Sequence, residues 1–431
     1  MKLSTYINAN INPNHAKKLL HALKCSTNEE FHKLILNNIS SVIEWFNSDD
    51  FKPYQNHLYP PLFNPKTLEL DNSQYCANLA WDCNIPLNNS NVKFIYISPH
   101  GVGAAAFLTL LNQTCNVFCP ASWMLQEDAK YRYMVNFMNF MDKNIAINIS
   151  EINIINIEKY LCLLDPKIPI LYQVRDPISL LKHSYGRDWS KVQRTYDKNF
   201  DLNYDYTLYI KYLTPNKTHM KDDFETLLHD TFFNHYLLQK INTNNIQYID
   251  MNELSNKKSF NTLTKLANNF NFTPPHTTTK ELFNRKEFRG YIRYLLPLVF
   301  HVNQNIKLTI DRYYINTEQY NIMDKFCNNN LKYDIGIYID KNNLNIFLNH
   351  KNYNQIVNYL SSFLNDIKQI IDLTEDTMMK EDEVLYYLKH NINARLKLKN
   401  ILDIELSHIK KHRPDIVSSW AYYQNFKSMC N

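Results

Sequence analysis

The sequence predicts an α/β fold in which a parallel sheet is flanked by helices. Between residues 91 and 300, short apolar runs typical of buried strands alternate with segments of helical periodicity. This alternation indicates a parallel sheet covered on both faces, and such sheets bind ligands beyond the carboxyl ends of their strands. The 45% hydrophobic and 21% charged residues are those of a globular chain with a sizeable core.

Three parts are expected along the chain. Residues 1–90 form an N-terminal helical and irregular segment, residues 91–300 form the α/β core, and residues 301–431 form a module of a β-hairpin and long helices. In the first part, residues 26–48 begin with a Ser/Thr cap followed by Glu, and their apolar residues recur at helical spacing. We therefore expect one amphipathic helix there, followed by an irregular, proline-rich stretch.

The core elements follow from the same patterns. Strands are expected at the apolar runs of residues 93–98, 145–149, 168–174 and 246–250. Helices are expected at about residues 104–114, 128–141, 154–164, 177–185, 223–241 and 259–270. Because strand and helix alternate, the carboxyl ends of the strands share one edge of the sheet.

Residues 301–431 show a different pattern of apolar residues. Apolar residues alternate with others from Tyr333 to Ile339 and again from Leu344 to Leu348, which predicts a hairpin with one buried face. Ile306, Leu308 and Ile310 add a third expected strand. Two long helices, at about residues 351–372 and 380–411, complete a module suited to acceptor binding or oligomerisation.

The composition argues against several classes of protein. The formal net charge of +5 is small for 431 residues, and Lys and Arg form no single tract, so nucleic acid is not an expected partner. No apolar stretch approaches the roughly 20 residues of a membrane-spanning helix, and the N-terminus lacks the apolar core of a secretory signal. We expect a cytoplasmic protein without a transmembrane segment.

The eight cysteines indicate no metal site. They are scattered, and several lie inside apolar patterns, as in a reducing compartment where thiols act as small apolar side chains. Cys115 and Cys119 are four residues apart, but no second Cys or His pair completes a tetrahedral zinc site. We therefore expect no bound metal.

A glycine-containing loop follows the first expected strand and precedes a helix. Glycine accepts positive φ, and the N–H groups that open a helix lack partners within it, so such a loop suits a phosphate. The candidate cradle is Pro99, His100, Gly101, Val102, Gly103 and Ala104, and it holds two of the five glycines of the chain. An ordinary strand-to-helix turn explains the same glycines, and this alternative stays open.

The loop lacks the Lys and following Ser or Thr with which nucleotide triphosphatases grip a phosphate. His100 and Ala104 stand in that neighbourhood instead. Hydrolysis of ATP or GTP with magnesium is therefore not expected.

Arg175 follows the expected strand at residues 168–174. If this strand neighbours the first one, the guanidinium stands beside the loop and can grip a phosphate by two parallel hydrogen bonds, with the hydroxyls of Ser179 or Ser184 adding more. Asp176 and Pro177 suit the first positions of the next helix. The alternative, that Arg175 only pairs with a carboxylate, stays open.

These motifs resemble those of the sulfotransferase superfamily, a P-loop-like α/β fold. The resemblance covers about residues 91–290, and it is carried by the Pro-x-Gly loop, by the Arg-Asp-Pro strand end, and by "IQYIDMNEL" followed by "SFNTLTKLANNFNFTPP". It implies that the loop holds the 5′-phosphosulfate end of a nucleotide donor, 3′-phosphoadenosine 5′-phosphosulfate in that superfamily. It also implies that Arg175, with a Ser two turns on, holds the 3′-phosphate.

The stretch "VRDPISLLKH" is also similar to a poorly characterised bacterial family from surface-polysaccharide loci, loosely labelled sugar transferases. The chain departs from the sulfotransferase pattern in ways that leave the donor uncertain. The loop lysine is replaced around His100, the loop is one residue longer, and His183 stands two turns beyond Arg175 with Ser184 after it. A late basic run with Arg285, Lys286 and Arg289 is more typical of a solvated surface than of the superfamily's basic-glycine motif.

Three functions stay open. The first is a transferase that moves a small anionic group, sulfuryl or phosphoryl-like, from a nucleotide donor to a sugar hydroxyl of a bacterial surface (capsular) polysaccharide. The second is a glycosyltransferase that uses a nucleotide sugar, which the lack of an Asp-x-Asp metal site at a strand end disfavours. The third is a non-catalytic binding protein on the same fold.

Transfer to a hydroxyl needs a general base, and imidazole titrates near neutral pH. His100 and His183 are the candidates for this role, with Glu127, Asp128 and His219 as alternatives that the sequence does not place. The partners expected are therefore a nucleotide donor and a glycan acceptor, and the oligomeric state stays open.

Overall fold

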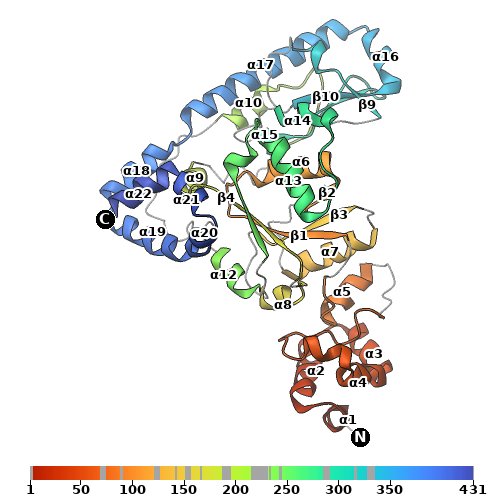
Figure 1. The fold of residues 1–431 in the computed structure, drawn as a ribbon. Coiled ribbons are helices and arrows are strands. Elements are labelled where there is room, and N and C mark those ends of the chain that lie inside the picture. The colour runs from red at the N-terminus through yellow and green to blue at the C-terminus, as the bar shows by residue number, and fades with distance from the viewer. Residues whose placement is uncertain are drawn as a thin grey trace.

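A five-stranded parallel sheet forms the core of the computed structural model (Figure 1). Its strands run in the spatial order β2-β3-β1-β4-β6. They are β1 (Val92–Ile97), β2 (Val117–Phe118), β3 (Asn144–Asn148), β4 (Ile170–Val174) and β6 (Ile246–Asp250). The four expected core strands and their parallel arrangement are confirmed, whereas the two-residue β2 is too short to leave a pattern in the sequence.

The structure describes residues 3–67, 74–87, 91–120, 127–140, 143–150, 157–165, 167–186, 196–214, 232, 234–241, 245–284, 292–314, 318–327 and 335–430. No helix within these ranges has both the length and the apolar character needed to cross a membrane.

Helices cover both faces of the parallel sheet. Successive side chains of a strand point to opposite faces, so Phe94 and Tyr96 of β1 pack on one side and Ile95 and Ile97 on the other. The first side is covered by α6 (Ala104–Cys115) and α13 (Ser259–Phe270). The second side is covered by α7 (Glu127–Phe140), α8 (Ile157–Cys162), α9 (Pro177–Tyr185) and α12 (Asn234–Lys240).

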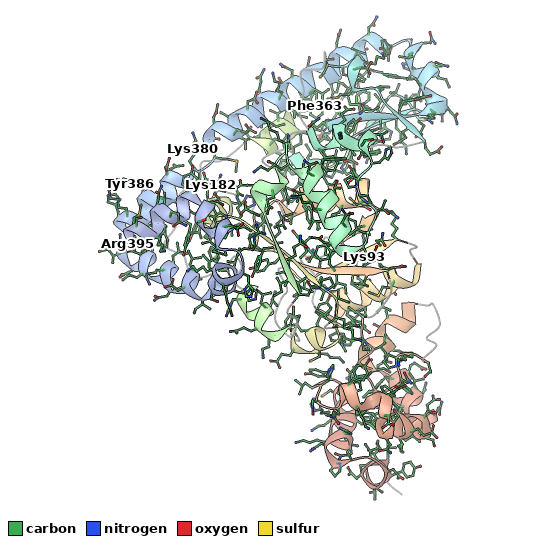
Figure 2. The ribbon with its side chains drawn as sticks, in the orientation of Figure 1. Lys93, Lys182, Phe363, Lys380, Tyr386 and Arg395 are labelled. Atoms are coloured by element: carbon green, nitrogen blue, oxygen red, sulfur yellow. The ribbon has the colours of Figure 1, made fainter. Side chains whose placement is uncertain are left out.

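A second sheet has the spatial order β5-β7-β8-β10-β9 and its own apolar core. Its strands are β5 (Asn199–Phe200), β7 (Leu298–His301), β8 (Lys307–Arg312), β9 (Gln319–Asn321) and β10 (Ile335–Asp340). The helices α10 (Thr207–Leu213) and α17 (Tyr353–Thr377) pack on it, and the buried Phe363 of α17 is labelled in Figure 2. The expected third strand at Ile306 to Ile310 is present as β8.

The expected hairpin is wrong in its second arm. Residues Leu344 to Leu348 form the short helix α16 (Leu344–Leu348), and β10 instead pairs antiparallel with β8 and β9. In this helix Phe347 is buried while Ile346 is 58% exposed. Five residues of mixed apolar character fit helical and alternating spacing equally well, so periodicity alone could not separate them.

The N-terminal part folds around a separate apolar cluster. Its helices are α1 (Leu3–Asn10), α2 (Pro13–Cys25), α3 (Glu29–Asn37), α4 (Ile39–Asn47) and α5 (Gln74–Asp82). The single helix expected at residues 26–48 is two helices that meet at Asn38. The Asn28 side chain, rather than Ser or Thr, caps the first of them by accepting hydrogen bonds from the Glu30 and Phe31 amides.

The C-terminal helices pack on the parallel-sheet core, against α9, rather than on the second sheet (Figure 1). They are α18 (Glu381–His390), α19 (Ile392–Glu405), α20 (Ser407–His412), α21 (Pro414–Ser419) and α22 (Ala421–Met429). The expected helix at residues 380–411 is therefore three helices. The expected boundary at residue 300 also differs, because β5 and β7 belong to the second sheet.

Short elements complete the described chain. They are η1 (Asp49–Tyr54), η3 (Met251–Leu254), η4 (Thr277–Thr279), α14 (Lys280–Asn284), α15 (Ile292–Leu295), η5 (Met323–Lys325) and η6 (Lys341–Asn343).

Candidate functional site

The carboxyl ends of β1 and β4 lie side by side at the point where the chain changes direction across the sheet. From β1 the chain continues to β2 and β3 on one side, and from β4 it continues to β6 on the other. In open α/β sheets, this switch in strand order opens a crevice in which ligands bind. Pro99 is buried at the end of β1, and Ala104 is the first residue of α6, so residues 99–104 form the loop at this switch.

Both loop glycines have the backbone conformation that favours glycine. Gly101 has φ of 90° and Gly103, the residue that precedes α6, has φ of 82°. A Cβ added to Gly101 would lie 2.8 Å from Cδ2 of His183, whereas one added to Gly103 would meet only Cε of Met251 at 3.5 Å. Gly101 is thus required both by its backbone and by the close approach of His183.

Side chains of β4 and its end hold the loop by its carbonyl oxygens. The buried Gln173 donates from Nε2 to the Val102 oxygen at 2.7 Å and accepts from the Tyr96 hydroxyl at 2.5 Å. Arg175 donates from Nη1 to the Gly101 oxygen at 2.7 Å. Arg175 and the loop therefore lie next to each other, as expected.

This anchoring fixes the direction of two loop amides. In a trans peptide the N–H of one residue points opposite to the C=O of the residue before it. The oxygens of Gly101 and Val102 point toward Arg175 and Gln173, so the N–H groups of Val102 and Gly103 point to the other side of the loop. They lie at the N-terminal, positive end of α6, where adjacent amides of this kind suit an anion.

The two candidate bases lie together. The ring centroids of His100 and His183 are 5.2 Å apart with an interplanar angle of 46°. His183 also packs against Gly101, so both imidazoles belong to the loop region. The two histidines lie close together, and this arrangement favours neither of them over the other as the general base.

The hydroxyl of Ser179 on α9 contacts the C-terminal helices. Ser179 donates its hydroxyl to Glu381 at 2.8 Å, and Lys182 contacts the same carboxylate oxygen at 2.9 Å. Ser184 is 2% exposed, on the inner side of α9. Lys182, labelled in Figure 2, marks the place where α9 meets the C-terminal helices. Burial favours the neutral form of Glu381, but the hydrogen bonds from Lys182 and Ser179 outweigh it and hold the pKa of this carboxyl below 4.5.

Two buried carboxylates at the ends of β4 and β6 hold the C-terminal segment. Asp176 caps α9 through the Ile178 amide, and its other oxygen accepts from the amides of Tyr422 and Tyr423 at 3.1 Å each. Burial raises the pKa of Asp176 despite these bonds. Asp250 accepts from the Trp420 indole at 2.7 Å. The predicted capping role of Asp176 is confirmed, and it extends to a second helix.

Of the remaining sequence candidates, Asp128 has its side chain within the described residues. Asp128 accepts a hydrogen bond from Arg132 at 2.5 Å, one turn along α7. His219, Arg285, Lys286 and Arg289 lie outside the described residues, as does the side chain of Glu127. In the described part of the chain, no cluster of three His, Cys, Asp or Glu side chains could hold a metal ion.

Two residues that hold the loop, Tyr96 and Gln173, were not predicted from the sequence. Tyr96 and Gln173 interrupt apolar runs of central strands, and such buried polar side chains need hydrogen-bond partners. Their place in buried strands therefore already indicated that these two side chains have hydrogen-bond partners. Glu381 left no such signal, because it lies 202 residues from Ser179.

The C-terminal part of the chain is similar to a described family. Residues 248–431 match the model of a protein of unknown function (DUF2972), which is less than half of the chain. The match begins within β6 and includes Asp250 and Trp420, but the loop and Arg175 precede it. No curated protein and no solved structure matches the chain.

Proposed function

We propose that the chain is a transferase that moves a small anionic group, sulfuryl or phosphoryl-like, from a nucleotide donor to a sugar hydroxyl of a bacterial surface polysaccharide. The donor has two anionic ends, as in 3′-phosphoadenosine 5′-phosphosulfate. The observation that carries this proposal is the pairing of the loop after β1 with Arg175 at the end of β4. The sulfotransferase-like form of the α/β fold is part of the same proposal.

The loop amides and Arg175 lie on opposite sides of the loop, and this arrangement supports a donor with two separated anionic ends. The Val102 and Gly103 amides face one side of the loop, while Arg175 holds the Gly101 oxygen on the other. The amides and the guanidinium thus form two sets of donors, each suited to an anionic group. A nucleoside 3′,5′-bisphosphate carries two such groups across its ribose, whereas a nucleotide sugar carries one diphosphate.

The chemistry requires one proton transfer and one displacement. The acceptor oxygen forms a bond to the sulfur or phosphorus atom, the bond from that atom to the donor's 5′-phosphate oxygen breaks, and the nucleotide leaves with its negative charge. The loop amides and the positive end of α6 stabilise this charge. His100 or His183 accepts the proton of the sugar hydroxyl.

A thermal-shift panel tests the proposal, because a ligand at 100 times its Kd adds about 2.7 kcal/mol to the free energy of unfolding. The panel contains adenosine 3′,5′-bisphosphate, uridine and cytidine diphosphates, and nucleotide sugars. We expect stabilisation by the bisphosphate that Arg175→Ala abolishes. Lys182→Ala is the matched control, because it removes a cation of the adjacent α9 that contacts Glu381.

Two results would contradict the proposal. Stabilisation by nucleotide sugars alone would favour a glycosyltransferase. No response to any nucleotide would favour a binding protein without transferase activity.

A further inference from the structure

The helix α19 carries apolar side chains on two faces. Ala394, Leu398 and Leu402 are buried against the parallel-sheet core, as is usual for a surface helix. Ile392 and Leu396 are instead 59% and 48% exposed. The buried face accounts for the packing of this helix, so its exposed apolar residues need a separate explanation.

The exposed residues gather on one face. Residues four apart, or a multiple of four, lie on the same side of a helix, so Ile392 and Leu396 share a face of α19 with Ile404, which is 59% exposed. Tyr386 of α18 is 68% exposed, and Figure 2 shows it at the same outer edge of the molecule as Arg395 of α19. Single exposed apolar residues are ordinary, whereas a group of them marks an interaction site.

α18 and α19 are fixed beside each other at this edge. Arg395 donates from Nη1 to the carbonyl oxygens of Leu388 and Lys389 at 3.4 and 3.1 Å, at the end of α18. The two helices also pack on each other. We therefore treat the exposed apolar residues of both helices as one surface, the outer patch, which consists of Tyr386, Ile392, Leu396 and Ile404.

Lysines border the outer patch. Successive residues of a helix are about 100° apart, so Lys399 and Lys397 lie on either side of the patch residues of α19. The acid on this face, Asp403, contacts Lys399 at 2.8 Å and Lys410 of α20 at 3.6 Å. Two ammonium groups thus share one carboxylate, which leaves an excess of positive charge.

The same excess holds for the two helices as a whole. Residues 392–412, which form α19 and α20, contain five Lys or Arg and two Asp or Glu, a net charge of +3, whereas the whole chain of 431 residues carries +5. A row of apolar side chains with lysines beside it is typical of helices that lie in a membrane surface. Clustered lysines on such a helix complement anionic lipids.

We propose that the outer patch binds the surface of a bilayer that contains anionic lipids. Its isoleucine and leucine side chains enter the boundary of the acyl chains, Tyr386 lies at the level of the headgroups, and the bordering lysines contact lipid phosphates. The inference goes beyond the proposed function and does not rest on it, because the patch includes neither the loop of residues 99–104 nor Arg175.

Vesicle sedimentation with the full chain tests the inference. We expect the chain to sediment with vesicles of mixed phosphatidylcholine and phosphatidylglycerol and to stay in the supernatant with vesicles of phosphatidylcholine alone. Salt screens charges at a membrane surface, so a higher ionic strength should weaken the binding.

Two double variants separate the apolar and the charged contribution. Ile392→Ser with Leu396→Ser removes apolar contact with the bilayer and should lower the partition coefficient roughly tenfold or more. Lys397→Gln with Lys399→Gln should lower it by a similar factor, roughly tenfold or more, whereas Lys397→Arg with Lys399→Arg keeps the charge and should bind within about threefold of the parent chain.

Ile346→Ser with Leu348→Ser is the matched control. These two residues are 58% and 36% exposed, but they lie on α16, which packs with the second sheet. Their replacement removes a similar exposed apolar area elsewhere on the molecule. It should leave vesicle binding unchanged.

Several results would overturn the inference. They are no binding to the mixed vesicles, equal binding to both kinds of vesicle, unchanged binding of the Ile392 and Leu396 variant, and equal loss in the α16 control. Dimerisation that this variant abolishes, measured by sedimentation velocity without lipid, would assign the outer patch to a second copy of the chain. If circular dichroism shows that the variant does not fold, the lysine variants provide the same test, and none of these results depends on nucleotide binding.

Discussion

Gly101 and Gly103 differ in what a side chain would meet. Both have positive φ, which costs a residue with a Cβ about 1–2 kcal/mol. Only at Gly101 does the added atom also approach His183 to 2.8 Å, so His183 must move. The two positions therefore separate the cost of backbone conformation from the cost of displacing a candidate base.

We expect Gly103→Ala to lower the free energy of unfolding by about 1–2 kcal/mol and Gly101→Ala to lower it further. The difference arises from the displacement of His183, so Gly101→Ala should also reduce the proposed transferase activity more strongly. Chemical denaturation and an activity assay check both. Equal effects of the two substitutions on stability and activity would show that His183 does not depend on this contact.

At the level of elements, the helix after β4 is tied to the C-terminal helices by one carboxylate. Glu381 opens α18 and accepts from both Ser179 and Lys182 of α9. The side chains of Lys182 and Glu381 are each 15% exposed, so this pair is much less screened than an exposed one. Its contribution to stability should therefore depend on pH.

The folded chain holds the pKa of Glu381 below 4.5, because the bonds from Lys182 and Ser179 outweigh the effect of burial. Since the pKa is lower in the folded state, the stabilisation is complete above pH 4.5 and is lost as the pH falls through the folded value. Glu381→Gln should lower the free energy of unfolding by roughly 1–3 kcal/mol at pH 7. It should also make the decrease of this free energy below pH 4.5 shallower.

Glu158→Gln is the control, because Glu158 pairs with Lys240 at 2.7 Å while their side chains are 48% and 42% exposed. An exposed pair contributes about 0–1 kcal/mol. If the free energy of unfolding of Glu381→Gln falls with decreasing pH as steeply as that of the parent chain, the Glu381 carboxylate is not the cause of this pH dependence.

A helix or strand is predicted well from the sequence when its apolar pattern is long enough and is bounded by polar residues. The core strands and α13 were predicted within two residues, because each is an apolar run bounded by polar residues. The helices that break at Asn38, Asn391 and Leu406 were predicted as continuous, because their periodicity continues across the breaks. The place of Arg175 followed from strand adjacency, but the partners of Ser179 and Asp176 come from residues more than 200 positions later, which no local pattern encodes.

On the scale of the whole molecule, the C-terminal segment closes over the ends of two neighbouring strands. Asp176 at the end of β4 and Asp250 at the end of β6 hold residues 420–423 through one indole and two backbone amides. The segment similar to the family of unknown function begins within β6 and ends with these helices. The residues of the proposed donor site precede residue 248, and the matched segment packs against α9 beside them.

The most direct test of this account is a crystal structure of the chain with adenosine 3′,5′-bisphosphate. One phosphate should contact the amides of Val102 and Gly103 at the start of α6, and the other should lie at Arg175. A nucleotide bound away from the ends of β1 and β4, or with neither phosphate at these groups, would contradict the central claim.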